Sequence, residues 1–319
     1  MVFILTQEGD SSALYVLEWL LFMNQEVFMV SENDEIIDLS FCRDRDNEMC
    51  FDISFDKGLF STQKVKSYWY RRGSLSINFL KYSHYPEAVF EHLEREWKSL
   101  DEFFHYVIEQ NKHIGSISKI DINKLESIDE ASRVGLLVPA TYIHSTVDKL
   151  GELIGRPKEY ITKGINNIVD YVDANGVRYK SLTEKIEKNC INAVSKIFFP
   201  SLLQERIEKQ FEVRVFYLHG KCWSMAIFSQ VNEKTAIDFR NYDMHNPNRY
   251  VPFILPEEIE GKTIKFMHSV NLNTGSLDFI VTKENTFVFL EVNPDGQFDF
   301  LSQSCNYHLE LEIANYLIT

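Results

Sequence analysis

Two carboxylates and an amide are spaced for metal binding in the segment 277–294. Two apolar, β-branched runs in this segment predict a β-hairpin. If its turn has two central residues, Asp278 lies directly opposite Glu291, and side-chain alternation puts Asn293 on the face of Glu291. Like charges opposite each other repel on a sheet, whereas these oxygen donors suit Mg²⁺ shared with phosphate oxygens. The segment predicts such a site; the alternative is a solvated face.

Two arginines have positions suited to an anion. In the predicted strand 212–218, Arg214 shares a face with Phe216, where a guanidinium needs an anionic partner. A phosphate, Glu212 or another carboxylate would serve. Arg240 alternates onto one face with Asp238, a pair that means little by itself.

Two lysines fit the same electrostatic picture. Lys124 starts a predicted helix, and Lys163 lies between a predicted strand and Gly164. A lysine there brings a point positive charge beside a phosphate, although either lysine alone is more often a solvated surface residue. The motif Trp69-Tyr-Arg-Arg-Gly73 either holds an anionic segment or another carboxylate, or packs at a domain boundary.

Composition limits the class of protein. The chain has 319 residues with Lys+Arg 33 and Asp+Glu 47, a net charge of −14, which opposes binding to nucleic-acid phosphates. Its five cysteines are scattered, so neither a disulfide framework nor a zinc site is indicated. The most apolar window, 13–23, is too short to span a bilayer. We expect a cytoplasmic protein of about two domains, with no nucleic-acid or membrane partner.

Missing motifs exclude several enzyme classes. The sequence contains no GxGxxG, GxxxxGK[ST], GxSxG or HExxH. Dinucleotide oxidoreductases, P-loop NTPases, hydrolases with a nucleophile elbow and zincins therefore lack their signatures.

The first third of the chain predicts an α/β domain. A strand at 2–6, a helix capped near Asp10 and a strand at 27–30 imply a parallel sheet. Apolar residues from Val89 onward recur at helical spacing for about five turns, closing this domain near residue 112. Runs that could supply further strands are 36–41, 51–53 and 65–70.

The rest of the chain predicts mixed α+β structure with antiparallel hairpins. A helix is expected at 123–131, and another that begins at Ser195 or earlier and ends before Pro200. Asn175-Gly176 predicts a type I′ hairpin turn. The expected strands are 141–143, 160–162, 168–172, 177–181 and 201–204, with hairpins pairing 212–218 with 221–227 through His219-Gly220, and 277–282 with 286–292.

Together these motifs resemble the ATP-grasp ligases, and more narrowly the ATP-grasp peptide maturases that build microviridin-type and related graspetides. The Glu-x-Asn-Pro end is shared by ATP-grasp enzymes broadly, whereas Trp-Tyr-Arg-Arg with Asp-Phe-Arg narrows the resemblance to the maturases. The stretches that carry it are 69–72, 123–124, 131–141, 204–207, 212–215, 237–240, 277–279 and 290–294.

The resemblance implies an ATP-grasp fold of α/β and α+β class with an N-terminal pre-ATP-grasp α/β domain. The domains would be 1–115, a central lid subdomain at 116–200, and a C-terminal subdomain with the metal site at 201–319. The resemblance implies these roles: Lys124 and Lys163 contact phosphates or adenine, Gln204, Glu205 and Ile207 line the adenine hinge, Glu212 binds the ribose, Arg214 and Arg240 hold the γ-phosphate and acyl phosphate, and Asp278, Glu291 and Asn293 bind two Mg²⁺ ions.

The implied activity is ATP-dependent macrocyclisation of a ribosomal precursor peptide with a leader, by a cytoplasmic homodimer. Asp or Glu side chains would be activated as acyl phosphates and joined to Ser, Thr or Lys side chains. The alternative is an ATP-grasp carboxylate-amine ligase acting on a free amino acid or small peptide. A third hypothesis is a nucleotide-binding scaffold without catalysis, against which the full set of charged residues argues.

Overall fold

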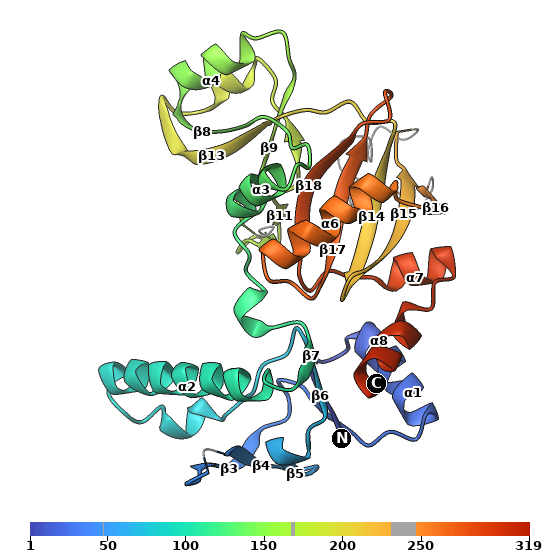
Figure 1. The fold of residues 1–319 in the computed structure, drawn as a ribbon. Coiled ribbons are helices and arrows are strands. Elements are labelled where there is room, and N and C mark those ends of the chain that lie inside the picture. The colour runs from blue at the N-terminus through green and yellow to red at the C-terminus, as the bar shows by residue number, and fades with distance from the viewer. Residues whose placement is uncertain (47, 167–169, 231–246) are drawn as a thin grey trace. The chain divides into compact units, whose positions relative to one another are not determined.

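The computed structural model describes residues 1–46, 48–166, 170–230 and 247–319. The chain divides into two compact units (Figure 1). The first unit contains residues 1–121, 272–275 and 294–319, and the second contains 122–271 and 276–293. This division is coarser than the three expected domains, which stay a prediction. Among the described residues, no helix is long and apolar enough to cross a membrane.

The first unit is built on a parallel sheet, as predicted. Its strand order is β2-β1-β6-β7, with every neighbouring pair parallel. Asp10 caps the first helix by accepting a hydrogen bond from the backbone N–H of Ala13 at 3.1 Å, which satisfies one of its free donors. The elements are β1 (Val2–Thr6), α1 (Ser11–Phe22), β2 (Val27–Val30), β6 (Ser67–Arg71) and β7 (Lys112–Ile114).

Two of the three further strand candidates do not join this sheet. The runs 36–41 and 51–53 lie in β3 (Ile36–Arg43) and β4 (Met49–Phe55), which form a separate antiparallel sheet with β5 (Gly58–Ser61). The predicted long helix is α2 (Glu87–Ile108), which buries Phe104 and Ile108 near its C-terminal end. The remaining elements of this unit are the short 3₁₀ helices η1 (Thr62–Lys64), η2 (Phe79–Tyr82) and η3 (Ile117–Lys119), and the α-helices α7 (Asp299–Cys305) and α8 (Leu309–Ile318).

The second unit contains a central sheet of order β12-β9-β13-β8. The helix expected to end before Pro200 is present only as the short α5 (Cys190–Ala193), and its expected extension toward Pro200 is wrong because Pro200 lies inside β13 (Ile197–Glu205). The pairing of β13 with β8 is irregular between Ile197 and Ser201, where a proline without an N–H is tolerated. The other elements here are β8 (Thr141–Thr146), α4 (Val147–Ile154), β9 (Tyr160–Lys163), β12 (Glu184–Lys185) and α5 (Cys190–Ala193).

The hairpin of β10 (Asp170–Val172) and β11 (Arg178–Lys180) forms as expected, but its turn is not type I′. Gly176 has a φ of 80°, whereas Asn175 does not have a positive φ, and type I′ requires both. The side chain of Asp173 determines the turn instead, since its Oδ1 accepts hydrogen bonds from the backbone N–H groups of Asn175 and Val177.

The C-terminal sheet has the order β16-β15-β14-β17-β18, and both predicted hairpins are present. His219 and Gly220 join β14 to β15 with φ values of 43° and 87°, the pattern of a type I′ turn. Helix α3 contacts β18 and α6 (Figure 1). The elements are α3 (Lys124–Arg133), β14 (Phe211–Leu218), β15 (Lys221–Phe228), β16 (Arg249–Phe253), α6 (Glu257–Ser269), β17 (Thr274–Val281) and β18 (Phe287–Asn293).

A β-bulge sets the register of the last hairpin. Its loop has three residues, 283–285, because the N–H of Thr282 bonds to the carbonyl of Thr286, and Asn285 has a φ of 58°. The two-residue turn is therefore wrong. Beyond the loop, Phe279 pairs with Phe289 but Asp278 pairs with Glu291. The extra residue in β18 restores the predicted pairing of the two carboxylates.

Candidate active site

Three charged side chains lie on three neighbouring strands of the C-terminal sheet. Arg214 is on β14, Asp278 on β17 and Glu291 on β18. The Nη1 of Arg214 donates a hydrogen bond to Oδ2 of Asp278 at 2.7 Å, and Asp278 pairs across the ladder with Glu291. Their side chains are 11%, 14% and 16% exposed, so the charges are largely shielded from water. The anionic partner expected for Arg214 is thus a protein carboxylate, Asp278.

Both predicted lysines converge on Glu291. The Nζ of Lys124 lies 3.5 Å from Oε2 of Glu291, and the Nζ of Lys163 lies 3.8 Å from the same atom. Lys124 also donates to the carbonyl oxygen of Asn166 at 2.9 Å. The two lysines come from α3 and from the end of β9, so elements far apart in the sequence supply the cations around one carboxylate.

Local contacts place α3 and its following loop against β18. The side-chain Oδ1 of Asn123 accepts from the N–H of Leu125 at 2.9 Å and so caps α3 at its start. After the helix, the carbonyl of Leu137 accepts from the N–H of Phe289 at 2.8 Å. These bonds fix the helix start that carries Lys124 relative to the strand that carries Glu291.

The charges of this cluster suit a nucleotide phosphate and a metal ion together. In the part of the chain that the structure describes, the three cationic side chains and two carboxylates of this cluster leave one excess positive charge. Coulomb attraction is strengthened where water is partly excluded, which favours a polyanion beside the lysines and Arg214. The carboxylates meanwhile supply hard oxygen donors.

The donor set fits Mg²⁺ shared with phosphate. Asn293 ends β18 two residues after Glu291 and pairs with Ser276, so its amide lies on the strand face predicted for it. Among the described residues, no group of three or more His, Cys, Asp or Glu side chains could hold a metal ion. Two carboxylates and an amide suit a cation whose remaining ligands come from phosphate and water.

Glu212, predicted to bind ribose, is buried beside a lysine. Its carboxylate accepts hydrogen bonds at 2.7 Å from Nζ of Lys209 and from Oγ of Ser229. Burial raises the pKa of Glu212 above its usual value, while Lys209 and Ser229 act in the opposite direction. The lysine partner was not predicted, and the only signal was its position three residues before Glu212.

The predicted adenine hinge lies at the end of β13. Gln204 is buried, and its Nε2 donates to Oγ1 of Thr141 at 3.0 Å. The carboxylate of Glu205 pairs with Lys158 at 2.7 Å. Ile207 follows the strand and is partly buried. The nucleotide-binding roles of Gln204, Glu205 and Ile207 stay predictions.

Arg240 and its neighbour Asp238 lie outside the described residues. The other predicted arginines, Arg71 and Arg72, belong to the first unit. Arg71 pairs with Asp10 at 3.2 Å, and Arg72 pairs with Asp295 at 3.3 Å. The motif was expected to bind either an anionic segment or another carboxylate. In this structure both arginines bind carboxylates of the protein.

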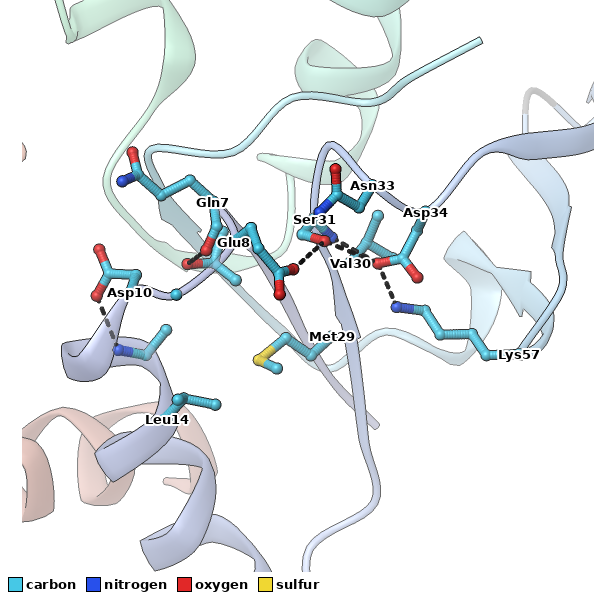
Figure 2. Close-up of a pocket in the computed structure, with 13 residues that line it drawn as sticks. Gln7, Glu8, Asp10, Leu14, Met29, Val30, Ser31, Asn33, Asp34 and Lys57 are labelled. Carbon is cyan, nitrogen blue, oxygen red and sulfur yellow. Dashed lines mark hydrogen bonds and ion pairs between the residues drawn. The ribbon is translucent and has the colours of Figure 1, made fainter. Parts of the chain in front are cut away.

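The first unit contains a pocket of about 340 Å³ at the ends of β1 and β2 (Figure 2). Its charged groups are bound by other groups of the protein. Lys57 pairs with Asp34 at 2.5 Å, and Asp34 also accepts from the N–H of Ser31. We place the candidate active site in the second unit, where Lys124, Lys163 and Arg214 gather around Glu291 and Asp278.

Comparison with solved structures identifies the fold. Neither a family model nor a curated protein sequence matches the chain. A solved RiPP-associated ATP-grasp ligase from Chryseobacterium gregarium, in complex with ADP and a leader and core peptide, matches with a TM-score of 0.84 at 20% identity, over 99% of this chain and 94% of that chain.

Two further solved structures give the same result. Macrocyclase MdnC from Microcystis aeruginosa MRC, bound with precursor peptide MdnA, matches with a TM-score of 0.79 at 20% identity, covering 100% of this chain and 99% of the other. ATP-grasp ligase PsnB, complexed with a phosphomimetic variant of its minimal precursor, Mg and ADP, matches at 0.70 and 14% identity, covering 99% and 97%. The predicted ATP-grasp fold is confirmed over the whole chain.

Proposed function

We propose that this chain is an ADP-forming ligase that macrocyclises a ribosomal precursor peptide. It activates Asp or Glu side chains of the peptide and joins them to Ser or Thr as ω-esters, or to Lys as ω-amides. The observation that carries the proposal is the convergence of Lys124 and Lys163 on Glu291, beside the Arg214–Asp278 pair. Phosphate-binding cations and metal-binding carboxylates in one cluster are what phosphoryl transfer to a carboxylate needs.

The reaction needs two steps with a balanced exchange of bonds. A substrate carboxylate oxygen bonds to the γ-phosphorus of ATP while the bond to the β-phosphate oxygen breaks, giving an acyl phosphate and ADP. A hydroxyl or amine of the peptide then attacks the acyl carbon, loses its proton, and expels phosphate. The peptide loses one water molecule overall for each ring.

The residues of the cluster stabilise the negative charge that moves during these steps. Lys124 and Lys163 would hold phosphate oxygens, and Arg214 would face the γ-phosphate and then the acyl phosphate, with Arg240 proposed for the same task. Groups already in position cost little reorganisation when the charge develops. Each of these cations is paired with a carboxylate in this structure. Nucleotide binding would therefore separate the lysines from Glu291 and Arg214 from Asp278.

Asp278, Glu291 and Asn293 would hold two Mg²⁺ ions. When bound, the ions would supply positive charge that offsets the charge of the phosphate groups. Their arrival also explains why two carboxylates are kept opposite each other on a sheet, where they otherwise repel.

Gln204, Glu205 and Ile207 would line the adenine, and Glu212 would bind the ribose. The end of β13 supports this role because Gln204 and Glu205 are already fixed by Thr141, Ala140 and Lys158. Preorganised groups bind a ligand at lower entropic cost.

The partner would be a peptide with a leader segment, and the enzyme a homodimer in the cytoplasm. The solved structures with leader or precursor peptides bound support the peptide. The homodimer is proposed from the resemblance, and light scattering of the wild-type protein tests it.

The test is whether ADP release depends on peptide. The protein is mixed with ATP, Mg²⁺ and the leader-bearing short peptide rich in Thr/Ser and Asp/Glu that is encoded beside its gene, if one is present. ADP release that requires this peptide supports the proposal. Equal release with free aspartate or glutamate and lysine would favour the amino-acid ligase instead.

A further inference from the structure

Two ammonium groups lie beside the same carboxylate oxygen in the second unit. The Nζ atoms of Lys124 and Lys163 are 3.5 and 3.8 Å from Oε2 of Glu291. All three side chains are at most 22% exposed, and water screens partly buried charges less than exposed ones. In this structure the negative charge of Glu291 is therefore balanced by two cations of the protein.

Lys124 has an anchor besides Glu291. Its Nζ donates a hydrogen bond to the carbonyl oxygen of Asn166 at 2.9 Å. Asn166 lies three residues after Lys163, so this bond ties the start of α3 to the segment that carries the second lysine. The two ammonium groups are thus kept in one place by a backbone group as well as by Glu291.

The second carboxylate of the cluster is compensated in the same way. Nη1 of Arg214 donates a hydrogen bond to Oδ2 of Asp278 at 2.7 Å. The nearby pair of Lys209 and Glu212, with its charged groups 2.7 Å apart, adds no net charge. Both carboxylates that could bind a metal ion are therefore already engaged by cations.

A free divalent cation would be repelled from this site. Mg²⁺ binds carboxylate oxygens at about 2.1 Å, so an ion on Oε2 of Glu291 would lie within about 6 Å of both lysine nitrogens. Even at an effective dielectric constant of about 20, the repulsion between a divalent ion and one ammonium group at that distance changes a binding constant by well over 10-fold. The ion would also compete with the lysines for the oxygen that it uses.

A nucleotide would remove this obstacle. Its phosphate groups are negatively charged, and the ammonium group of a lysine binds phosphate as a point charge. A phosphate beside Lys124 and Lys163 would draw both ammonium groups from Glu291. The carboxylate and the phosphate oxygens would then form a ligand set that suits Mg²⁺.

We propose that Lys124 and Lys163 make metal binding at Glu291 depend on nucleotide. The two lysines oppose a free divalent cation and favour phosphate, so the site selects the metal–nucleotide complex over the metal ion alone. They therefore act on the two ligands with opposite sign. This inference rests on the proposed function, because it assumes that Glu291 binds metal.

The test measures metal binding directly, without turnover. Mn²⁺ is titrated into the full chain with and without ADP, and free Mn²⁺ is followed by electron paramagnetic resonance. Lys163→Met and Lys124→Met each remove one ammonium group, whereas Lys163→Arg keeps the charge. Lys149→Met, on α4 with a 59% exposed side chain, is the control.

Without ADP, we expect Lys163→Met and Lys124→Met to bind Mn²⁺ about 10-fold or more tightly than the wild-type protein does. Lys163→Arg and Lys149→Met should bind it as the wild type does. Loss of a merely structural contact would weaken metal binding, so the expected gain has the opposite sign from damage to the fold. Thermal unfolding identifies a variant that fails to fold, and the other Met variant then carries the comparison.

Two results separate failure of this inference from failure of the proposed function. Wild-type or weaker Mn²⁺ affinity without ADP in either folded Met variant, Lys163→Met or Lys124→Met, would overturn the inference. If Glu291→Gln binds Mn²⁺ in the presence of ADP as tightly as the wild type, the proposed metal site itself is wrong.

Discussion

Arg214 on β14 and Asp278 on β17 form an ion pair with a 2.7 Å hydrogen bond on neighbouring strands. Asp278 in turn pairs across the ladder with Glu291. A cation and two carboxylates in a row can be separated by a nucleotide phosphate and metal ions that satisfy both kinds of group. The ion pair is therefore the state of the site that nucleotide binding would replace.

Replacing Arg214 by Lys should reduce peptide-dependent ADP release by about 10²-fold. Lysine keeps the charge but presents a point donor in place of a planar guanidinium. We expect the protein to stay folded, because lysine keeps a cation beside Asp278, and urea unfolding checks this. Arg133→Lys on the exposed face of α3, where the side chain is 69% exposed, is the control. Wild-type turnover in Arg214→Lys would exclude a guanidinium-specific role.

Replacing Glu291 by Gln should abolish turnover, with a loss of at least about 10²-fold. The amide keeps the shape but not the charge that pairs with both lysines and that would bind the metal. Glu284→Gln, in the exposed turn of the same hairpin, should behave as wild type. ADP release assays and urea unfolding separate loss of activity from loss of fold. Retained turnover in a folded Glu291→Gln protein would refute the metal assignment.

Replacing Lys163 by Met should weaken ADP binding by about 10–100-fold, the effect of one charged hydrogen bond. Lys163 is only 12% exposed at the end of β9, so its charge is weakly screened. Lys149→Met, on an exposed turn of α4 with a 59% exposed side chain, is the matched control. Calorimetric titration with MgADP measures both. Equal affinities would show that Lys163 does not contact the nucleotide.

A largely buried pair in the first unit, His105 and Asp101, predicts a pH effect on stability. Burial lowers the pKa of His105 from 6.5 to about 4, and burial raises the pKa of Asp101 from 3.8 to about 6. The two side chains lie 3.7 Å apart on α2, and the hydroxyl of Tyr68 lies 3.1 Å from Nδ1 of His105.

The two shifts have opposite signs. As pH falls below the unfolded-state pKa of His105, the unfolded chain binds a proton at this residue. The folded chain does not yet bind it, because its pKa is lower, so stability is lost. As pH falls through the raised pKa of Asp101, the folded chain takes up a proton first, so stability is gained. Over their common window the two effects nearly cancel.

Replacing one of the two residues should therefore reveal the pH dependence of stability that the other residue causes. Asp101→Asn should lose about 1–2 kcal/mol more than wild type between pH 7 and about pH 5, while His105→Gln should change in the opposite direction. Urea unfolding at the two pH values measures this. Parallel pH profiles for the three proteins would contradict the assignment.

Much of the site could be predicted from the sequence because hairpins are local. The pairing of Asp278 with Glu291 is correct, although the loop has three residues and a bulge corrects the register. A two-residue turn and a three-residue turn with one bulge give the same register beyond the bulge. The predicted pairing is therefore correct although the predicted turn is wrong.

Non-local contacts could not be predicted in this way. Pro200 indicated a helix end, but pairing with β8 and β9 makes the segment a strand, since tertiary contacts override local propensity. The partners of Arg72 lie 223 residues away. A motif can indicate that an arginine needs an acceptor, but sequence spacing does not identify the acceptor.

The most direct test of the central claim is the mass of the precursor peptide after incubation with the protein, ATP and Mg²⁺. We expect the peptide to lose the mass of one water molecule for each ring, and we expect Glu291→Gln to leave the peptide mass unchanged. Tandem mass spectrometry should place each loss between an acidic residue and a Ser, Thr or Lys. Release of ADP with the peptide mass unchanged would contradict the account.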